Sequence, residues 1–120
     1  MKYLVTLLSF LLVSTNASKS SIEEKTPLCG DDICVVQFNA GWNSSNDVDW
    51  VTNLKDCEVQ YIDIAADADA QNKYEIVVVP TIIVFNGKEV KRFQADISFA
   101  MKATKKEVQA VVDEILMDQF

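Results

Sequence analysis

Residues 79–87 have the sequence VPTIIVFNG, the stretch that gives the strongest indication of the fold. The apolar run over residues 76–85 is interrupted only by Pro80. Because proline has no N–H to donate to a neighbouring strand, we expect the strand to begin at this residue. The pair Asn86-Gly87 then favours a type I′ turn, whose two central positions need positive φ. Residues 76–93 therefore predict a β-hairpin.

Upstream of this hairpin, the sequence predicts two further strands. Residues 33–40, ICVVQFNA, are rich in β-branched and aromatic side chains and indicate a buried strand that ends in a polar turn over residues 41–46. Residues 58–64, EVQYIDI, alternate apolar and polar side chains and indicate a second strand. A helix between them would make a right-handed βαβ unit, so the two strands are expected to run parallel.

Three helices complete the predicted domain. The first, over residues 47–55, has Ser45 or Asn46 as its N-cap. A brief helix follows over residues 67–74, and a capping box at residues 104–107 begins an amphipathic C-terminal helix. Apolar side chains share one face of the first helix (Val48, Val51 and Leu54) and one face of the last (Val108, Val111, Val112, Ile115 and Leu116). The expected fold is α/β, with a mixed four-stranded sheet flanked by helices.

The first residues of the chain have the features of a secretory signal peptide, namely a basic residue, a largely apolar core over residues 3–13 and small residues up to Ala17. The core is shorter than the roughly 20 residues of a membrane span, so no permanent membrane anchor is expected. We predict a signal peptide over residues 1–17, a polar lead-in over residues 18–32 and one domain over residues 33–120. The mature protein is expected to be exported, either periplasmic or secreted.

The charge of the chain argues against several classes of ligand. There are 18 acidic and 11 basic residues, a net charge of −7, and no run of Lys or Arg that would make a basic patch, so nucleic acid is not an expected partner. With no His and three Cys, an ordinary zinc site is not expected either. Asp63, Asp67 and Asp69 lie close in sequence but lack the Gly and the terminal Glu of a calcium loop. We expect no metal and no cofactor.

The order of these elements, with VVQFNAGW at residues 35–42 and VPTIIVFNG at residues 79–87, resembles the thioredoxin family over residues 33–117. The two motifs are each moderately specific, and they occur in the order and at about the spacing that the family has. The resemblance implies a three-layer thioredoxin-like fold, trimmed at the N-terminus, because the family's first strand and helix are missing. It also implies a cis peptide bond before Pro80.

The chain departs from that family at the residues that carry its chemistry. The family has Cys-x-x-Cys after the tryptophan, whereas Trp42 is followed by Asn43, Ser44, Ser45 and Asn46. An amide forms neither a thiolate nor a disulfide, so the family's exchange reaction is impossible there. The family's buried acid aligns with Gln37, which does not titrate. The sequence therefore favours a redox-inactive module that binds a protein partner or has a structural role, rather than an enzyme.

The resemblance also indicates where a partner would bind. In the family, the residue before the cis proline offers its backbone to an extended polypeptide, and here that residue is Val79. The expected groove consists of Trp42, Val79, Pro80, Gln94 and Ala95. Three large apolar residues that follow it, Ile97, Phe99 and Met101, either cover their own domain or form a homodimer contact. Asn43-Ser44-Ser45 is also an N-glycosylation sequon, although a polar turn is the simpler explanation.

Three cysteines, Cys29, Cys34 and Cys57, leave room for one disulfide and one free thiol. Cys34 and Cys57 precede or begin adjacent predicted strands, so these two, or either of them with Cys29, could come within disulfide distance. We expect a structural disulfide, which suits a small exported domain. The alternative is a displaced redox site, in which Cys29 and Cys34, or the unpaired thiol, exchange disulfides with a partner.

Overall fold

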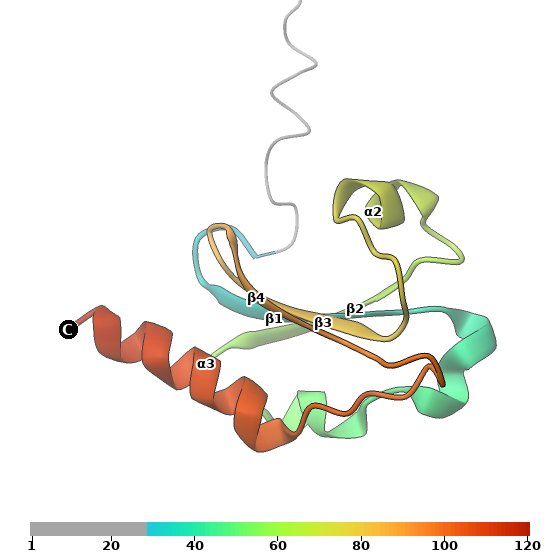
Figure 1. The fold of residues 1–120 in the computed structure, drawn as a ribbon. Coiled ribbons are helices and arrows are strands. Elements are labelled where there is room, and N and C mark those ends of the chain that lie inside the picture. Colours follow the sequence, from blue (N-terminus) through green and yellow to red (C-terminus); the bar gives the residue numbers. More distant parts are fainter. Residues whose placement is uncertain (1–28) are drawn as a thin grey trace, which may run out of the picture.

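A mixed four-stranded sheet forms the centre of the computed structural model, which describes residues 29–120 (Figure 1). The strand order is β2-β1-β3-β4, in which β1 and β2 are parallel and the other two pairs are antiparallel. The strands are β1 (Ile33–Asn39), β2 (Glu58–Asp63), β3 (Thr81–Asn86) and β4 (Glu89–Gln94). The predicted mixed sheet is confirmed. The predicted signal peptide and the lead-in up to residue 28 lie outside the described residues.

The central strand β1 is buried along its whole length, which explains its nearly continuous apolar sequence. Because successive side chains of a strand point to opposite faces, Val36 and Phe38 belong to the core on one face of the sheet, and Ile33 and Val35 to the core on the other. β3 is divided in the same way, with Ile83 on the first face and Ile82 on the second. The central strands therefore contribute to two cores.

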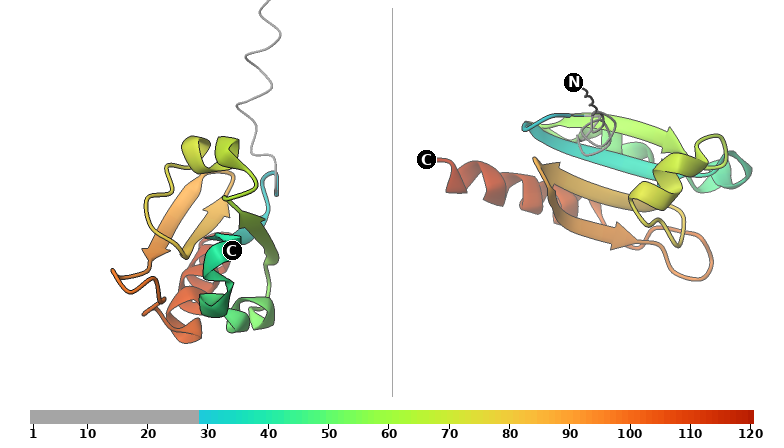
Figure 2. Two further views of the ribbon diagram at one scale, coloured as in Figure 1. Left: turned by 90° about the vertical axis from the view of Figure 1, so that its right-hand side faces the viewer. Right: turned by 90° about the horizontal axis from the view of Figure 1, so that it is seen from above.

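Helices cover both faces of the sheet and give the molecule three layers, as Figures 1 and 2 show. The short helix α2 (Ala68–Lys73) lies over one face, and α3 (Lys105–Asp118) lies over the other. The side chains of α3 that are buried are Val108, Val112 and Ile115. Thr104 and Glu107 form the predicted capping box at the start of α3. No helix of the described residues is long and apolar enough to cross a membrane.

The α-helix predicted over residues 47–55 is wrong. The chain instead forms two 3-10 helices, Gly41–Asn46 and Asp49–Asn53, separated by extended backbone at Asp47 and Val48. The Gln37 side chain binds both the N–H and the C=O of Val48, so these backbone groups are satisfied without a helix. The apolar face was predicted correctly, because Val48, Val51 and Leu54 are all buried.

The hairpin between β3 and β4 is confirmed, but its turn is not of type I′. Gly87 has a φ of 80°, whereas Asn86 does not have positive φ and remains part of β3. The pairing shifts by one residue between Val84 and Phe85, which is a β-bulge. The extra residue of the bulge, Val90, lies in β4, so Phe85 pairs with Glu89 across a connection of three residues in which Gly87 alone has positive φ.

Candidate functional site

The carboxyl end of β1 brings together the parts of the predicted groove that are far apart in sequence. The 3-10 helix Gly41–Asn46, which contains Trp42, follows β1 directly. β3 is antiparallel to β1 and pairs Thr81 with Phe38, so Pro80 lies at the same end. Gln94, the last residue of β4, pairs with Thr81. The peptide bond between Val79 and Pro80 is cis.

Three asparagines form a hydrogen-bonded network at this end of the sheet, where the thioredoxin motif would place two thiols. Asn43 and Asn39 are buried, and the Nδ2 of Asn43 donates to the Oδ1 of Asn39 at 3.0 Å. The Nδ2 of Asn46 donates to the Oδ1 of Asn43 at 2.8 Å. The Nδ2 of Asn39 in turn donates to the Oδ1 of Asp47 at 2.6 Å and to the backbone oxygen of Asn43 at 3.2 Å. The amides at positions 43 and 46 therefore hold the loop together.

The buried side chain of Gln37 has a related role. Its Oε1 accepts a hydrogen bond from the N–H of Val48 at 2.8 Å, and its Nε2 donates to the C=O of Val48 at 3.2 Å. This pair of bonds needs one donor and one acceptor. An amide has both, whereas an ionised carboxylate has acceptors only. Gln37 therefore fixes the loop, and it could not be replaced by a charged acid without loss of a bond.

These contacts decide what the loop can do chemically. Asn43 and Asn46 provide no thiol, and Gln37 provides no titrating group beside them. The Nδ2 of Asn43, the atom to which a glycan would be attached, is used in hydrogen bonds to Asn39 and to the backbone oxygen of Phe99. In the folded domain, the sequon at Asn43 is therefore a structural turn and not an accessible acceptor site.

Aromatic side chains mark the outer surface of the loop. Trp42 is 68% exposed, and its ring meets the ring of Phe99 edge to face with 5.6 Å between centroids. Ile97 is 96% exposed, whereas Met101 packs against the core beneath the sheet. The three apolar residues predicted as one homodimer contact thus have different surroundings.

The other residues of the predicted groove are less accessible. Val79 is only 4% exposed, Pro80 is fully buried and Ala95 is nearly so, whereas Gln94 is exposed. The N–H of Ala95 donates to the C=O of Pro80 at 3.0 Å, which continues the pairing of β4 with the chain before β3. The groove is therefore closed around Val79 and Pro80 and open at Trp42.

The acidic residues near this end have structural partners. The Oδ1 of Asp63 accepts from the N–H of Gly41 at 3.0 Å and from that of Ala65 at 2.9 Å, and Asp67 is the N-cap of α2. Asp47 accepts a hydrogen bond from the Tyr61 hydroxyl at 3.0 Å. Partial burial, this hydrogen bond and the charges of Asp47 and Asp63 raise the pKa of Tyr61 to about 12.

The cysteines lie at the opposite end of the sheet. Cys29 and Cys34 form a disulfide with 5.8 Å between their Cα atoms, and Cys57 is a free thiol, so a bond between Cys34 and Cys57 is excluded. Cys34 is fully buried and Cys29 is nearly so. Burial and the nearby charge of Asp56 raise the pKa of the Cys57 thiol, which disfavours the reactive thiolate. In a chain-entropy model, so short a disulfide loop stabilises the fold by about 2 kcal/mol.

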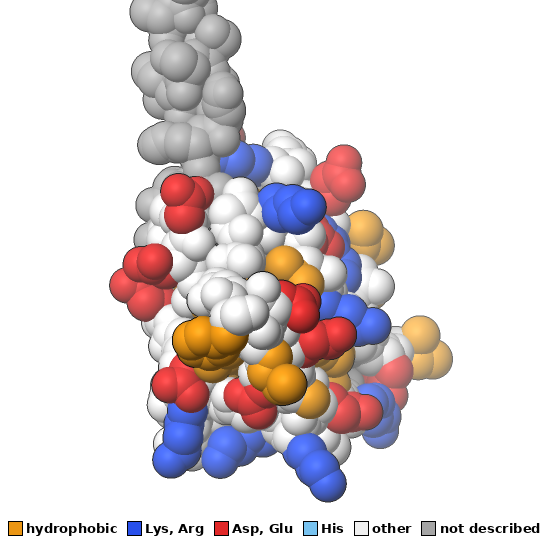
Figure 3. Space-filling model, turned by 90° about the vertical axis from the view of Figure 1, so that its left-hand side faces the viewer, with side chains coloured by type: hydrophobic (Ala, Val, Ile, Leu, Met, Phe, Trp, Pro, Cys, Tyr) orange, Lys and Arg blue, Asp and Glu red, His pale blue; other side chains and the backbone are white. Residues whose placement is uncertain are grey.

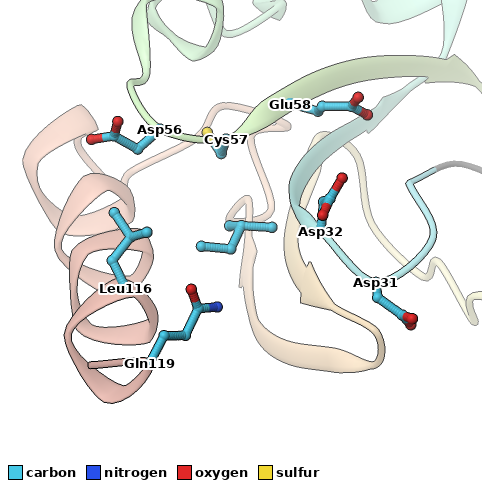
Figure 4. Close-up of a pocket in the computed structure, with 8 residues that line it drawn as sticks. Asp31, Asp32, Asp56, Cys57, Glu58, Leu116 and Gln119 are labelled. Carbon is cyan, nitrogen blue, oxygen red and sulfur yellow. The ribbon is translucent and has the colours of Figure 1, made fainter.

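Acidic side chains gather around a cavity at this end of the molecule. Figure 3 views this end and shows acidic, basic and hydrophobic side chains on its surface. Figure 4 shows a cavity of about 340 Å³ there, into which α3 contributes Leu116 and Gln119. Four carboxylates line it, those of Asp31, Asp32, Asp56 and Glu58. The sulfur atoms of Cys29 and Cys34 and a carboxylate oxygen of Glu58 lie within 4.8 Å of one another. Because the two sulfurs are bonded to each other in the disulfide, these three residues do not form a ligand set for a metal.

The overall fold is similar to that of solved thioredoxins. A point mutant of the thioredoxin from Halobacterium salinarum matches with a TM-score of 0.56 and 17% identity, over 79% of this chain and 82% of that one. The thioredoxin of Fasciola hepatica matches with a TM-score of 0.51 and 20% identity, over 81% and 89%. A designed protein gives a TM-score of 0.56 at 18% identity, over 72% and 83%. The chain therefore has a thioredoxin-like fold.

These structures support the fold alone, because the sequence identities are low. No protein-family model matches the sequence, and no curated protein does either. The activity and partners of this chain have to be argued from its own residues.

Several residues of the site were not predicted from the sequence. Asn39 and Asp47 belong to the amide network, and Phe99, which was expected to lie near the groove, contacts Trp42 across 57 positions of the chain. A polar residue at the end of a buried strand was the available signal for Asn39, because buried polar groups are almost always hydrogen-bonded. Nothing in the local sequence indicates the contact of Phe99.

We predict that Gln37→Glu destabilises the domain in a pH-dependent way. At pH 8 the new carboxylate is buried and loses the bond to the C=O of Val48, which should lower the free energy of unfolding by about 3 kcal/mol. Burial raises the pKa of this carboxyl in the folded state, so the loss grows as pH rises above its unfolded value and is smaller at pH 4. Urea unfolding at both pH values checks this. Gln37→Met is the control, and its loss of stability relative to the wild type should be the same at pH 8 and pH 4. A loss for Gln37→Glu that is also the same at the two pH values would contradict the account.

A second prediction concerns Asn43→Cys combined with Asn46→Cys. The side chains at these positions already meet, with 2.8 Å between the Nδ2 of Asn46 and the Oδ1 of Asn43, so the two cysteines should form a disulfide on oxidation. The reduced variant should be less stable by about 1–3 kcal/mol, because Asn39 loses partners. Thiol titration in a Cys57→Ser background measures the bond, and Asn43→Ser with Asn46→Ser controls for the lost network. Two thiols that persist after oxidation would contradict it.

Proposed function

We propose that this chain is a non-catalytic thioredoxin-like module, exported from the cell, that binds an extended segment of a protein partner at the Trp42 end of the sheet. The observation that carries the proposal is the amide network of Asn39, Asn43 and Asn46. Where the family that this chain resembles has thiols, the network has amides, which stabilise the loop and have no redox chemistry. The loop is therefore suited to present a surface and not to react.

The exposed indole of Trp42 is the best candidate for the contact with a partner. Trp42 is 68% exposed, although an indole is among the side chains that bury most apolar area in an interface. The loop below it is held rigid by the hydrogen bonds of Asn43 and Gln37, so little conformational entropy is lost on binding. A rigid, exposed aromatic side chain is what a binding surface requires.

Export is supported by two independent features. The sequence begins with the apolar segment described above, and Cys29 and Cys34 form a disulfide, a bond that is typical of oxidising compartments. We propose that the protein acts in the periplasm or outside the cell.

A second candidate function is thiol–disulfide exchange through Cys29 and Cys34, because these two residues are paired. Their burial and the raised pKa of Cys57 argue against it, since exchange needs an accessible disulfide or a thiolate. A third candidate is a homo-oligomeric structural subunit. Of the three residues of the predicted contact, Phe99 and Met101 pack against their own domain, and Ile97 is 96% exposed.

The redox-inactive character of the module predicts no reduction of insulin by residues 18–120 in the presence of dithiothreitol. The rate should equal that of a variant in which Cys29, Cys34 and Cys57 are all serine. A rate above that control would instead assign exchange chemistry to the cysteines and overturn the non-catalytic proposal. The precipitation of reduced insulin is the measurement.

Binding at Trp42 is tested with an unfolded protein that has no tryptophan, S-carbamidomethylated ribonuclease A. In a Trp50→Phe background, Trp42 is the single tryptophan of the chain, and its emission should shift to the blue as the partner covers it. Trp42→Ala should weaken binding at least about tenfold, as expected for an aromatic anchor. Met117→Ala is the matched control, because Met117 is 73% exposed on the far part of α3. Equal affinity for both variants would exclude Trp42 as the contact.

A further inference from the structure

The segment over residues 95–101, here called the strap, runs from the end of β4 across the carboxyl end of β1 before the chain reaches α3. In Figure 1 it lies beside the 3-10 helix that contains Trp42. It begins with the bond from the Ala95 N–H to the C=O of Pro80 at 3.0 Å. The strap therefore lies next to the loop that contains Trp42, at the end of the sheet where the groove was predicted.

Phe99 attaches the strap to the loop. Its ring contacts Trp42, and its backbone oxygen accepts a hydrogen bond from the Nδ2 of Asn43 at 3.3 Å. These are the contacts that a bound peptide would make, namely an aromatic side chain against the indole and a backbone carbonyl to a buried amide. The strap thus uses the binding groups of the module for a segment of its own chain.

The strap is held in shape by a local turn. The Asp96 carboxylate accepts from the N–H of Ser98 at 2.8 Å and from its hydroxyl, and it lies 3.4 Å from the Lys102 ammonium. Bonds from the Ser98 hydroxyl and N–H, with the nearby Lys102, lower the pKa of Asp96 to about 2. The hydrogen bonds and the ion pair of this turn are all made within residues 96–102.

The backbone of Phe99 is strained in this arrangement. Its φ of 63° lies in the left-handed region, which is unfavourable for a residue with a bulky side chain. Such a conformation persists only where surrounding contacts hold it. Here they are the contacts with Trp42 and Asn43 and, within the turn, the bond from the Phe99 N–H to the C=O of Asp96 at 3.0 Å.

We infer that the strap is a displaceable internal ligand, which occupies the peptide-binding groove until an extended segment of a partner replaces Phe99 on Trp42. This inference rests on the proposed function and describes its regulation. In the closed state the ring of Phe99 lies against the indole of Trp42, and opening makes that indole available to the partner. Because partner and strap compete for the same groups, the apparent affinity of the module is the intrinsic affinity multiplied by the fraction of molecules that are open.

Hydrogen exchange tests the strap without any partner. Phe99→Ala and Phe99→Gly should both speed exchange of the amides of Ala95 and Asp96, which donate to the C=O groups of Pro80 and Ala100, while those of Val108 and Val112 in α3 keep their rates. Phe99→Gly should have the smaller effect, because glycine tolerates the left-handed backbone and keeps the turn closed. Val90→Ala is the matched control, since Val90 is 43% and Phe99 42% exposed. Unchanged exchange at Ala95 and Asp96 in both variants would overturn the strap.

Titration with unfolded ribonuclease A separates this inference from the proposed function. If the population of the closed form is ten times that of the open form, removal of the Phe99 ring should raise the affinity for ribonuclease A by about tenfold. Trp42→Ala should instead weaken binding by at least about tenfold. If Phe99 were instead part of the partner's contact surface, its variants would bind more weakly, and the strap would be rejected while the module stands. If no form binds, the proposed function fails, and the exchange rates alone decide whether the strap opens.

Discussion

The rest of the structure depends on the need to satisfy two buried amides on the central strand. Gln37 and Asn39 lie in β1, which is buried along its whole length, and a polar group in such a place costs free energy unless it is bonded. Gln37 finds its partners on Val48, and Asn39 finds them on Asn43 and Asp47. The loop after β1 is therefore drawn back onto the sheet, and its helix is divided in two.

This constraint also explains why a scaffold similar to a redox fold has become a rigid platform. In the loop, side chains that could have been thiols are amides, which link the loop to the strand before it. Asn43 is buried and bonded inward, whereas the neighbouring Trp42 is 68% exposed. The aromatic contact with Phe99 then joins this platform to the segment before α3.

The two ends of the sheet have been specialised differently. At the amino end of β1, the disulfide between Cys29 and Cys34 fixes the start of the domain, and a free thiol with a raised pKa lies among carboxylates. At the carboxyl end, hydrogen bonds and an aromatic pair replace covalent chemistry. A small domain gains stability from the disulfide at the first end and has an exposed aromatic side chain, Trp42, at the second.

The sequence by itself determined the elements whose pattern is local: the buried strands, the hairpin, the capped C-terminal helix and the presence of amides, not thiols, at positions 43 and 46. Periodicity, turn residues and a capping box act over a few residues, so they can be recognised without the fold. Only the tertiary structure decided the helix type after β1, the disulfide pairing and the contact of Phe99 with Trp42. Each depends on a contact between residues whose meeting is set by sheet topology, and in each case that contact outweighs the weak local preference of the chain.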